Sequence, residues 1–229
     1  MTVRVVLADD QEVVRAGLRT ILELADEITV VGEAADGLAA VGLARALVPD
    51  VVLMDVRMPV LDGIEATRAI AADPALRSVR VVMLTTFDHD DHLFAALQAG
   101  ASGYLLKDLE GRDLIRAVRT VAGGAALLDP AITERVIQEA AQRSDPRPVD
   151  ARRLDVLTPR ERDIVALVAR GLSNDDIART LVISPHTAKT HVNRAMAKLR
   201  ARDRAQLVII GYETGLVRTG GSTSPPAPC

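Results

Sequence analysis

Cysteine and long apolar runs are scarce in this chain. Cys229 is the single cysteine among 229 residues, so no internal disulfide can form, which fits a reducing cytoplasm. No segment approaches the roughly 18 consecutive apolar residues that a transmembrane helix requires. The opening MTVRVVLADD lacks the apolar core of a secretory signal. We therefore expect a cytoplasmic protein with no membrane partner.

Lysine and aromatic residues are also scarce. Only three of the 28 basic residues are lysines, namely Lys107, Lys189 and Lys198, a bias that fits a high-GC coding genome better than a function. The chain has two Tyr and two Phe, so each aromatic side chain carries more weight than usual. Hydrophobic residues still make up 48% of the sequence, enough to build one large domain or two modest ones.

The charges are unevenly distributed, although the formal net charge of the whole chain is only -3. Residues 1–125 hold 12 Arg and Lys against 19 Asp and Glu, a net charge of -7. Residues 152–218 hold 13 against 7, a net charge of +6, and residues 126–151 hold 3 against 5. An acidic N-terminal part and a basic C-terminal part predict two modules with different partners, and the basic module is suited to nucleic acid.

Short apolar runs alternate with helical patterns over the first 125 residues. The predicted strands are Val3–Ala8, Ile28–Gly32, Val51–Val56, Val81–Thr85 and Gly103–Leu106. The predicted helices are Gln11–Ala25, Gly37–Leu47, Gly63–Ala72, Asp90–Ala99 and Gly111–Val121. Five βα units in succession are typical of a parallel sheet with helices on both faces. We predict a doubly wound α/β domain with a five-stranded parallel sheet.

The remainder of the chain has a helical pattern. A helix is predicted from Asp129-Pro130 to Gln142, followed by a linker at 144–150 that contains two prolines. Four helices follow between 158 and 214. Their starts are marked by a capping-box pattern at Thr158 and Glu161, a cap at Ser173 or Asn174, the pair Ser184-Pro185, and Asp203. Gly171 supplies a turn. The tail TGGSTSPPAPC is expected to be disordered.

Asp55 lies within an apolar run, where an ionised carboxylate is expensive unless something neutralises it. Asp9 and Asp10 end the first predicted strand, and ligands of doubly wound sheets lie beyond the carboxyl ends of adjacent strands. We expect these three carboxylates to converge. At an effective dielectric of about 20, each pair roughly 4 Å apart costs about 4 kcal/mol. Mg²⁺, which binds few carboxylates and keeps waters for phosphate oxygens, would relieve this repulsion.

Two further groups complete a site for phosphoryl transfer. Lys107 ends the fifth strand and adds positive charge, and Thr85 ends the fourth strand and offers a hydroxyl, although Thr86 is an alternative. Asp55 would be the nucleophile, because a carboxylate can form an acyl phosphate. Taken singly, an Asp after a strand is usually a cap or turn residue, and a lysine there is usually solvated. The segment 88–92, DHDDH, is more simply a polar loop than a metal cluster.

These residues resemble the receiver domain of bacterial two-component response regulators. The resemblance rests on Asp9-Asp10, DVRMPVLDG around Asp55, LTT at 84–86 and GASGYLLKD at 100–108. It implies the flavodoxin-like strand order 2-1-3-4-5, a histidine kinase as phosphate donor, and a metal site formed by Asp9, Asp10, Asp55 and the Arg57 carbonyl. It also implies that Thr85 and Tyr104 are the switch pair and that Lys107 contacts the phosphoryl group. Asp108 stands where many receivers have proline.

The helical part predicts a helix-turn-helix. In Pro185–Leu199 an apolar face would pack inward, formed by Ala188, Val192, Ala195 or Met196, and Leu199. The opposite face is polar, which by itself is ordinarily just a solvated surface. The net positive charge of the module and the preceding helix and turn favour double-stranded DNA as the ligand, with this helix in the major groove.

The segment also resembles the LuxR-type helix-turn-helix domain, which joins receivers in the NarL/FixJ family. The matching pieces are LTPRE, GLSNDDIA and SPHTAKTHV. The resemblance implies that Lys189, Thr190 and Asn193 face base edges and that Thr187 and Arg194 hold phosphates. Asn193 stands where several relatives have Lys, and Ala188 where many have Val. The last helix, Arg204–Gly215, with Leu207, Ile210 and Leu216 exposed or half-buried, would form the contact of a homodimer.

The sequence therefore predicts a response regulator in which phosphorylation of Asp55 gates dimerisation and DNA binding. The predicted segments are a receiver at 1–122, a linker with a helix at 123–153, a DNA-binding domain at 154–217 and a tail at 218–229. An aspartyl-phosphate phosphatase would need a second acid two residues after the nucleophile, where Arg57 stands, so we expect no enzyme. A regulator that works without phosphate need not keep the full set of site residues.

Overall fold

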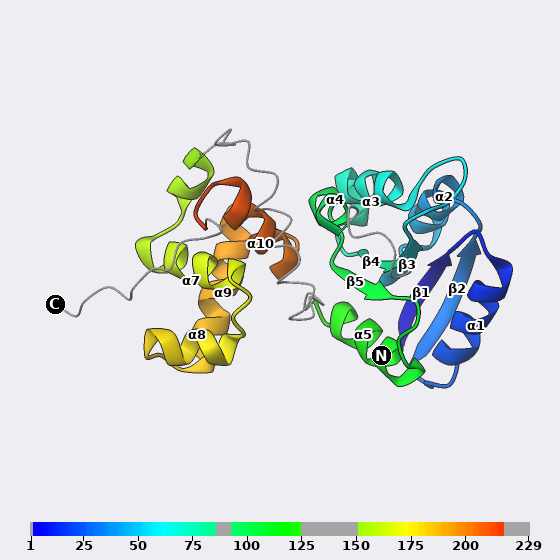
Figure 1. Cartoon of the computed structure of the whole chain (residues 1–229), viewed down its shortest axis with the longest axis horizontal. Helices are drawn as coiled ribbons and strands as arrows, with labels where there is room; N and C mark the ends of the chain where they lie inside the picture. Colours follow the sequence, from blue (N-terminus) through cyan, green and yellow to red (C-terminus); the bar gives the residue numbers. More distant parts are fainter. Residues whose placement is uncertain (1, 86–92, 125–150, 218–229) are drawn as a thin grey trace. The chain divides into compact units, whose positions relative to one another are not determined.

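The computed structural model describes residues 2–85, 93–124 and 151–217 (Figure 1). These residues form two compact units, one α/β and one all-helical. Several sequence predictions lie outside the described residues: the helix from Asp129-Pro130 to Gln142, the linker at 144–150, the tail at 218–229, Thr86 and the polar loop at 88–92.

The α/β unit alternates strands and helices as predicted. The strands are β1 (Val3–Ala8), β2 (Ile28–Ala34), β3 (Val51–Asp55), β4 (Arg80–Thr85) and β5 (Gly103–Leu106). The helices are α1 (Glu12–Leu22), α2 (Gly37–Leu47), α3 (Gly63–Ala72), α4 (Leu93–Ala99) and α5 (Gly111–Ala122), with a 3-10 turn, η1, at Pro74–Leu76. α1 ends at Leu22 rather than Ala25, and the 3-10 turn was not predicted.

All described strand pairs are parallel, and the sheet order is β2-β1-β3-β4-β5. This confirms both the doubly wound fold and the strand order 2-1-3-4-5. Helices α1 and α5 cover one face of the sheet, and α2, α3 and α4 cover the other (Figure 1). Because the order reverses at β1 and β3, the helices that follow these strands leave toward opposite faces, which opens the edge where Asp9 and Asp55 lie.

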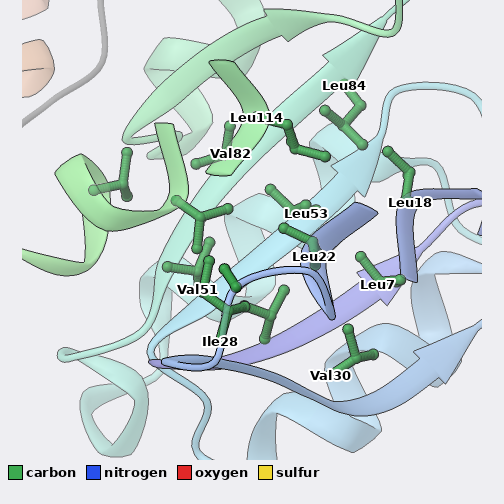
Figure 2. Close-up of a cluster of buried hydrophobic side chains, with 14 residues drawn as sticks. Leu7, Leu18, Leu22, Ile28, Val30, Val51, Leu53, Val82, Leu84 and Leu114 are labelled. Carbon is green, nitrogen blue, oxygen red and sulfur yellow. The ribbon is translucent and has the colours of Figure 1, made fainter. Parts of the chain in front are cut away.

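A large part of the core lies between the sheet and the helices α1 and α5 (Figure 2). Alternate strand residues such as Leu7, Leu53 and Leu84 point into it and meet Leu22 and Leu114 from the helices. These five side chains are at most 2% exposed. The intervening strand residues are buried as well, which is why the central strands are apolar without a break. Packing on both faces of the sheet therefore holds the carboxyl ends of these strands in place.

The helical unit contains η3 (Ala151–Val156), α7 (Pro159–Ala169), α8 (Asn174–Leu181), α9 (Pro185–Leu199) and α10 (Arg204–Glu213). The predicted capping box is present: the Glu161 main-chain N–H donates to Thr158, and the Glu161 carboxylate accepts from the Thr158 N–H. Ser173 caps α8 in the same way, together with Asp176. The predicted inward face of α9 is also confirmed, because Ala188, Val192, Ala195 and Leu199 are buried.

The prediction for α10 was partly wrong. Leu207 and Ile210 are 0% and 1% exposed, whereas Leu216 is half-buried. One reason is that α10 lies close to α7: a side chain at Gly211 would meet the Ala169 methyl group. Periodicity alone gave no distinct outward face, because the middle of this helix, residues 207–211, is an unbroken apolar run.

None of the helices in the described ranges has the length and apolar character needed to cross a membrane.

Candidate functional site

The carboxylates of Asp9, Asp10 and Asp55 come together at the carboxyl ends of β1 and β3. One oxygen of each lies within 4.8 Å of the others. The strand register explains the convergence, since Ala8, before Asp9, pairs with Met54, before Asp55. Asp9 and Asp55 are 0% and 6% exposed, whereas Asp10 faces solvent. The three acids are therefore clustered as the sequence predicted.

Lys107, which follows β5, reaches into this cluster. Its Nζ lies 2.8 Å from Asp55 Oδ1 and 2.6 Å from Asp9 Oδ2, and its side chain is only 13% exposed. Its main-chain N–H donates to the Thr85 carbonyl at 2.7 Å, which ties the loop after β5 to the end of β4. The Lys107 ammonium group therefore bridges the two buried carboxylates through a charge-assisted contact with each.

The protonation of the pocket follows from burial and from these contacts. Burial raises the pKa of the Asp55 carboxyl above its ordinary value, and the nearby charge of Asp9 adds to the increase. The hydrogen bond and the charge of Lys107 act in the opposite direction. Burial would lower the pKa of Lys107, but its contacts with Asp55 and Asp9 outweigh this and the pKa is raised. Lys107 is therefore charged, and its charge favours the carboxylate form of Asp55.

The donor set fits a divalent cation. The three carboxylates carry three negative charges when ionised and Lys107 supplies one positive charge, so the cluster remains acidic. All three groups offer hard carboxylate oxygens. Mg²⁺ prefers such ligands and few of them. The residues present thus fit the predicted metal.

The remaining predicted residues lie near this edge of the sheet. Thr85 is the last residue of β4, is buried, and pairs with Leu106 of β5. Tyr104 lies on β5, opposite Met83 of β4, so Thr85 and Tyr104 belong to adjacent strands. Arg57 lies in the loop that begins directly after Asp55, and its side chain is exposed. The structure places these residues on the elements the sequence predicted.

The loop between β3 and α3 is fixed at both ends by main-chain hydrogen bonds. Gly63 N–H donates to the Val56 carbonyl and Gly37 N–H donates to the Leu61 carbonyl, both at 3.0 Å. A Cβ at Gly63 would collide with the Asp55 carbonyl oxygen, and one at Gly37 would collide with the Leu61 carbonyl. Only glycine permits these close approaches. The N-termini of two helices therefore hold the loop that carries Arg57.

One residue near the site was not predicted. Arg15, on α1, donates from Nη1 to the main-chain carbonyl of Asp9 at 2.7 Å. Its spacing from Asp9 in the sequence could have drawn attention to it. However, an arginine in the first turns of a helix is ordinarily solvated, and only the tertiary structure shows it turned back to the strand end.

The predicted DNA-contact residues lie along α9. Lys189, Asn193 and Arg194 are exposed on it, whereas Thr187 and Thr190 are half-buried. The Thr190 hydroxyl donates to the His186 carbonyl at 2.9 Å, one turn earlier. The Thr187 hydroxyl lies 2.8 Å from Ser184 Oγ, which also accepts from the Thr187 N–H and so caps the helix. The exposed side chains are free to move toward a ligand, and the two threonines are held by their own helix.

Comparison with known families accounts for both units. The family described as "Response regulator receiver domain" matches residues 5–119. The family described as "Bacterial regulatory proteins, luxR family" matches residues 155–210. The chain belongs to the response regulators with a LuxR-type DNA-binding domain. It is a two-component response regulator and a transcriptional regulator.

Full-length relatives resemble this response regulator over nearly its whole length. The transcriptional regulatory protein YxjL of Bacillus subtilis is 41% identical over 217 residues, covering 94% of this chain and 98% of YxjL. The response regulator protein VraR of Staphylococcus aureus is 37% identical over 218 residues, 95% of this chain and 100% of VraR.

Two solved structures are also similar. The response regulator ChrA of a heme-sensing two-component system is 38% identical, with a TM-score of 0.51, and the match covers 94% of this chain and 99% of that one. RcsB, in a structure of two dimers bound to two parallel DNAs, is 26% identical, with a TM-score of 0.54, covering 91% and 96%. Since this family consists of transcription regulators rather than enzymes, the phosphatase hypothesis is set aside.

Proposed function

We propose that a sensor histidine kinase phosphorylates Asp55 and that this modification gates dimerisation and sequence-specific binding to double-stranded DNA. The observation that carries the proposal is the buried Asp55 carboxylate, clustered with Asp9 and Asp10 within 4.8 Å and contacted by Lys107 at 2.8 Å. Three clustered acids, two of them paired with one lysine, lie at the edge of the sheet where ligands of doubly wound folds bind, which supports a functional site.

The chemistry assigned to Asp55 is nucleophilic. A carboxylate oxygen attacks the phosphorus of a phosphohistidine, the phosphorus–nitrogen bond breaks with its electron pair going to the imidazole, and an acyl phosphate remains on Asp55. Lys107 favours the ionised form of Asp55 before the transfer and would contact phosphoryl oxygens after it. Asp9, Asp10, Asp55 and the Arg57 carbonyl would hold Mg²⁺, which neutralises phosphoryl oxygens when bound.

The proposed output begins at β4 and β5. Phosphorylation adds roughly 1.5 to 2 negative charges and new acceptor oxygens at Asp55. The Thr85 hydroxyl can donate to one of these oxygens, and its movement would change the space available to Tyr104, whose side chain is buried on the adjacent strand in this structure. Thr85 and Tyr104 would thus be the switch pair that reports the phosphate to the surface used for dimerisation.

The proposed DNA surface is the exposed side of α9. Lys189, Thr190 and Asn193 would meet base edges, and Thr187 and Arg194 would hold phosphates. Support comes from the exposure of Lys189, Asn193 and Arg194 and from RcsB, whose structure contains DNA. A dimer related by a two-fold axis would require a pseudo-palindromic site. We place the receiver at 1–122, the linker at 123–153, the DNA-binding domain at 154–217 and the protein in the cytoplasm.

The deciding experiment is labelling with acetyl phosphate in the presence of Mg²⁺. Wild type is expected to acquire one phosphate that hydroxylamine and alkali remove, as expected of an acyl phosphate, and to bind promoter DNA more tightly after phosphorylation. The Asp55→Asn variant should acquire none, whereas Asp26→Asn, a change at an exposed loop residue, should behave like wild type. Equal labelling of wild type and Asp55→Asn would overturn the assignment of the phosphoacceptor. Labelling that leaves DNA affinity unchanged would overturn the gating.

A further inference from the structure

The loop that carries Asp9 and Asp10 lacks the usual support of a helix cap. It connects β1 to α1, and Gln11, at the N-cap of α1, makes no side-chain capping hydrogen bond. The Asp9 carboxylate accepts instead from the Gln11 N–H at 2.9 Å, while the Asp9 N–H donates to Ala34 of β2 at 3.1 Å. The main-chain carbonyl of Asp9 remains, and it is here that the Arg15 guanidinium donates, at 2.7 Å.

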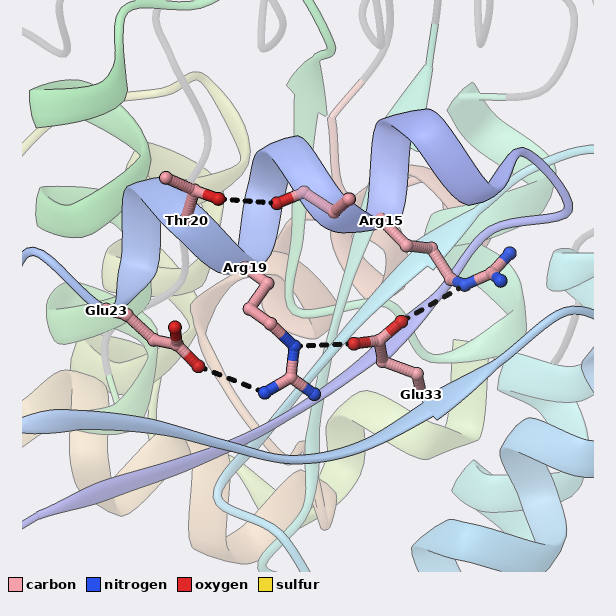
Figure 3. Close-up of polar contacts among 6 residues, drawn as sticks. Arg15, Arg19, Thr20, Glu23 and Glu33 are labelled. Atoms are coloured by element: carbon pink, nitrogen blue, oxygen red, sulfur yellow. Dashed lines mark hydrogen bonds and ion pairs between the residues drawn. The ribbon is translucent and has the colours of Figure 1, made fainter.

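The guanidinium of Arg15 is itself held in place by an ion-pair network on the surface of α1 and β2 (Figure 3). Arg15 Nε lies 3.3 Å from Glu33 Oε2, and Arg19 Nε lies 2.6 Å from the other Glu33 oxygen. Arg19 also reaches Glu23, 3.0 Å away, one turn later at the C-cap of α1. The Arg15 side chain is 14% exposed and that of Arg19 is 38% exposed, so Arg15 is the more enclosed of the two.

We propose that Arg15 is a positioning residue for the acidic cluster. It fixes the main chain of Asp9, so that the Asp9 and Asp10 carboxylates are held toward Asp55 against their mutual repulsion. The inference rests on the proposed function, in which this cluster binds Mg²⁺.

The chemistry of the side chain suits this role. The planar guanidinium donates to the Asp9 carbonyl through Nη1 and to Glu33 through Nε at the same time. An ammonium group on a flexible stem has no fixed fork and would not hold the two partners in one geometry. Arg15 also brings positive charge to a site rich in carboxylates. Glu33 orients Arg15, and Arg15 orients the main chain of Asp9, a proposed metal ligand. Residues that hold a metal ligand in this way affect the affinity for the metal.

The test compares Arg15→Met with Arg19→Met in the full-length protein. Both substitutions remove an ion pair with Glu33, but only Arg15 contacts the Asp9 main chain. Mg²⁺ affinity is measured by calorimetry, with folding checked by circular dichroism. We expect Arg15→Met to weaken Mg²⁺ binding by about 10-fold or more, as is usual for outer partners of metal ligands. Arg19→Met should change it less than about twofold.

Further measurements separate the possible failures. Arg15→Lys should also weaken Mg²⁺ binding, because it keeps the charge and loses the fork. If Arg15→Met does not fold, Glu33→Gln provides a milder test, since it frees the guanidinium without removing it. Wild-type Mg²⁺ affinity in Arg15→Met, or equal losses in both arginine variants, would overturn the positioning role. If the wild-type protein itself binds no Mg²⁺, the proposed function fails at its metal site, independently of Arg15.

Discussion

At the scale of single residues, Asp55 illustrates how burial and charge oppose each other. Burial raises the pKa of its carboxyl, which disfavours the nucleophilic form. Lys107, at 2.8 Å, lowers the same pKa and restores part of the negative charge. A carboxylate in this state is poorly solvated and has few partners to lose before attacking phosphorus. Burial and the Lys107 contact together thus suit this carboxylate to the proposed phosphoryl transfer.

Val60 shows a different residue-scale feature, a strained main chain. Its φ angle is 66°, in the left-handed region, and the Leu61 N–H donates to the Pro59 carbonyl across it, at 2.7 Å. This is a γ-turn with positive φ, which is rare, and a β-branched residue is poorly suited to it. Its side chain is 79% exposed, so side-chain packing does little to offset the strain in the main chain.

Val60→Gly is expected to stabilise the protein by about 1 kcal/mol, because strain in this region costs about 1–3 kcal/mol and the added flexibility of the unfolded chain offsets only part of that. Urea unfolding followed by circular dichroism measures the change. The control is Val13→Gly in α1, equally exposed at 85%, which should destabilise by about 0.5 kcal/mol. A loss of stability in both variants would contradict the strain argument.

At the scale of elements, close contacts between main chains determine where the acidic cluster lies. The first residue of α3, Gly63, lies directly against the carbonyl of Asp55 and donates to Val56. The first residue of α2, Gly37, lies against the carbonyl of Leu61 in the same way. Such contacts leave no room for a side chain, so the positions of two helix starts and one strand end depend on each other.

Gly63→Ala should therefore destabilise the protein by about 2–3 kcal/mol, since the added methyl group forces main-chain shifts. It should also weaken Mg²⁺ binding, because the displaced atoms belong to Asp55. Gly42→Ala is the matched control: Gly42 lies in the middle of α2 with no atom within 4 Å of the new methyl group, and the change should stabilise by about 0.5–1 kcal/mol. Thermal unfolding and calorimetry measure both effects, and unchanged Mg²⁺ affinity in Gly63→Ala would contradict this coupling.

A second element-scale contact joins two helices of the DNA-binding unit. Glu161, in the first turn of α7, accepts from the Thr158 N–H at 2.8 Å and from Lys198, in the last turn of α9, at 2.7 Å. Its side chain is only 5% exposed. The hydrogen bond from Lys198 lowers the pKa of Glu161, burial acts against this, and the contacts with Thr158 lower it further.

A lowered pKa in the folded state means that this contribution to stability is present above the ordinary value of 4.5 and is lost as the pH falls through the folded-state pKa. At pH 7, Glu161→Gln should lower the free energy of unfolding by about 1–2 kcal/mol. The difference from wild type should shrink steadily below pH 4.5. Urea titrations at several pH values measure it, with Glu12→Gln as an exposed control. A difference that is independent of pH would show that charge has no part in it.

At the scale of the whole molecule, the dominant feature is the separation of charge. Residues 1–125 carry a net charge of -7 and residues 152–218 carry +6, although the total is only -3. An acidic receiver repels nucleic acid, so the attraction to DNA must come from the second unit. The proposed surface on α9 adds Lys189 and Arg194, both exposed, to that field.

DNA binding by the phosphorylated dimer should accordingly weaken steeply as the salt concentration rises. With roughly 6 to 8 phosphates contacted, the logarithm of the association constant should fall with a slope of about -5 to -7 against the logarithm of salt concentration. Fluorescence anisotropy with a labelled promoter fragment gives the slope. Arg194→Ala should make it less steep by about two, because each of the two protomers loses one phosphate contact. Affinity that does not respond to salt would contradict a role in binding DNA phosphates.

Much of the fold could be predicted from the sequence because its signals are local. Alternating βα patterns, the apolar run before Asp55, the capping box at Thr158 and the inward face of α9 each depend on neighbouring residues, and the structure confirms all of them. The positions of Asp9, Asp10 and Asp55 also followed, since strand ends in a doubly wound sheet meet at one edge. The boundaries were less accurate, as at the end of α1, and α10, apolar on all sides, gave no period to interpret.

By itself the sequence determined the doubly wound sheet, the helix-turn-helix and the cluster of acids, because periodicity and strand ends are properties of the chain alone. Only the tertiary structure decided that Arg15 turns back to the Asp9 carbonyl, that Gly37 and Gly63 touch the loop after Asp55, and that Leu207 and Ile210 are buried. These are contacts between residues distant in the sequence or on a helix without a distinct face. Their physical cause is close packing between elements, which no local pattern records.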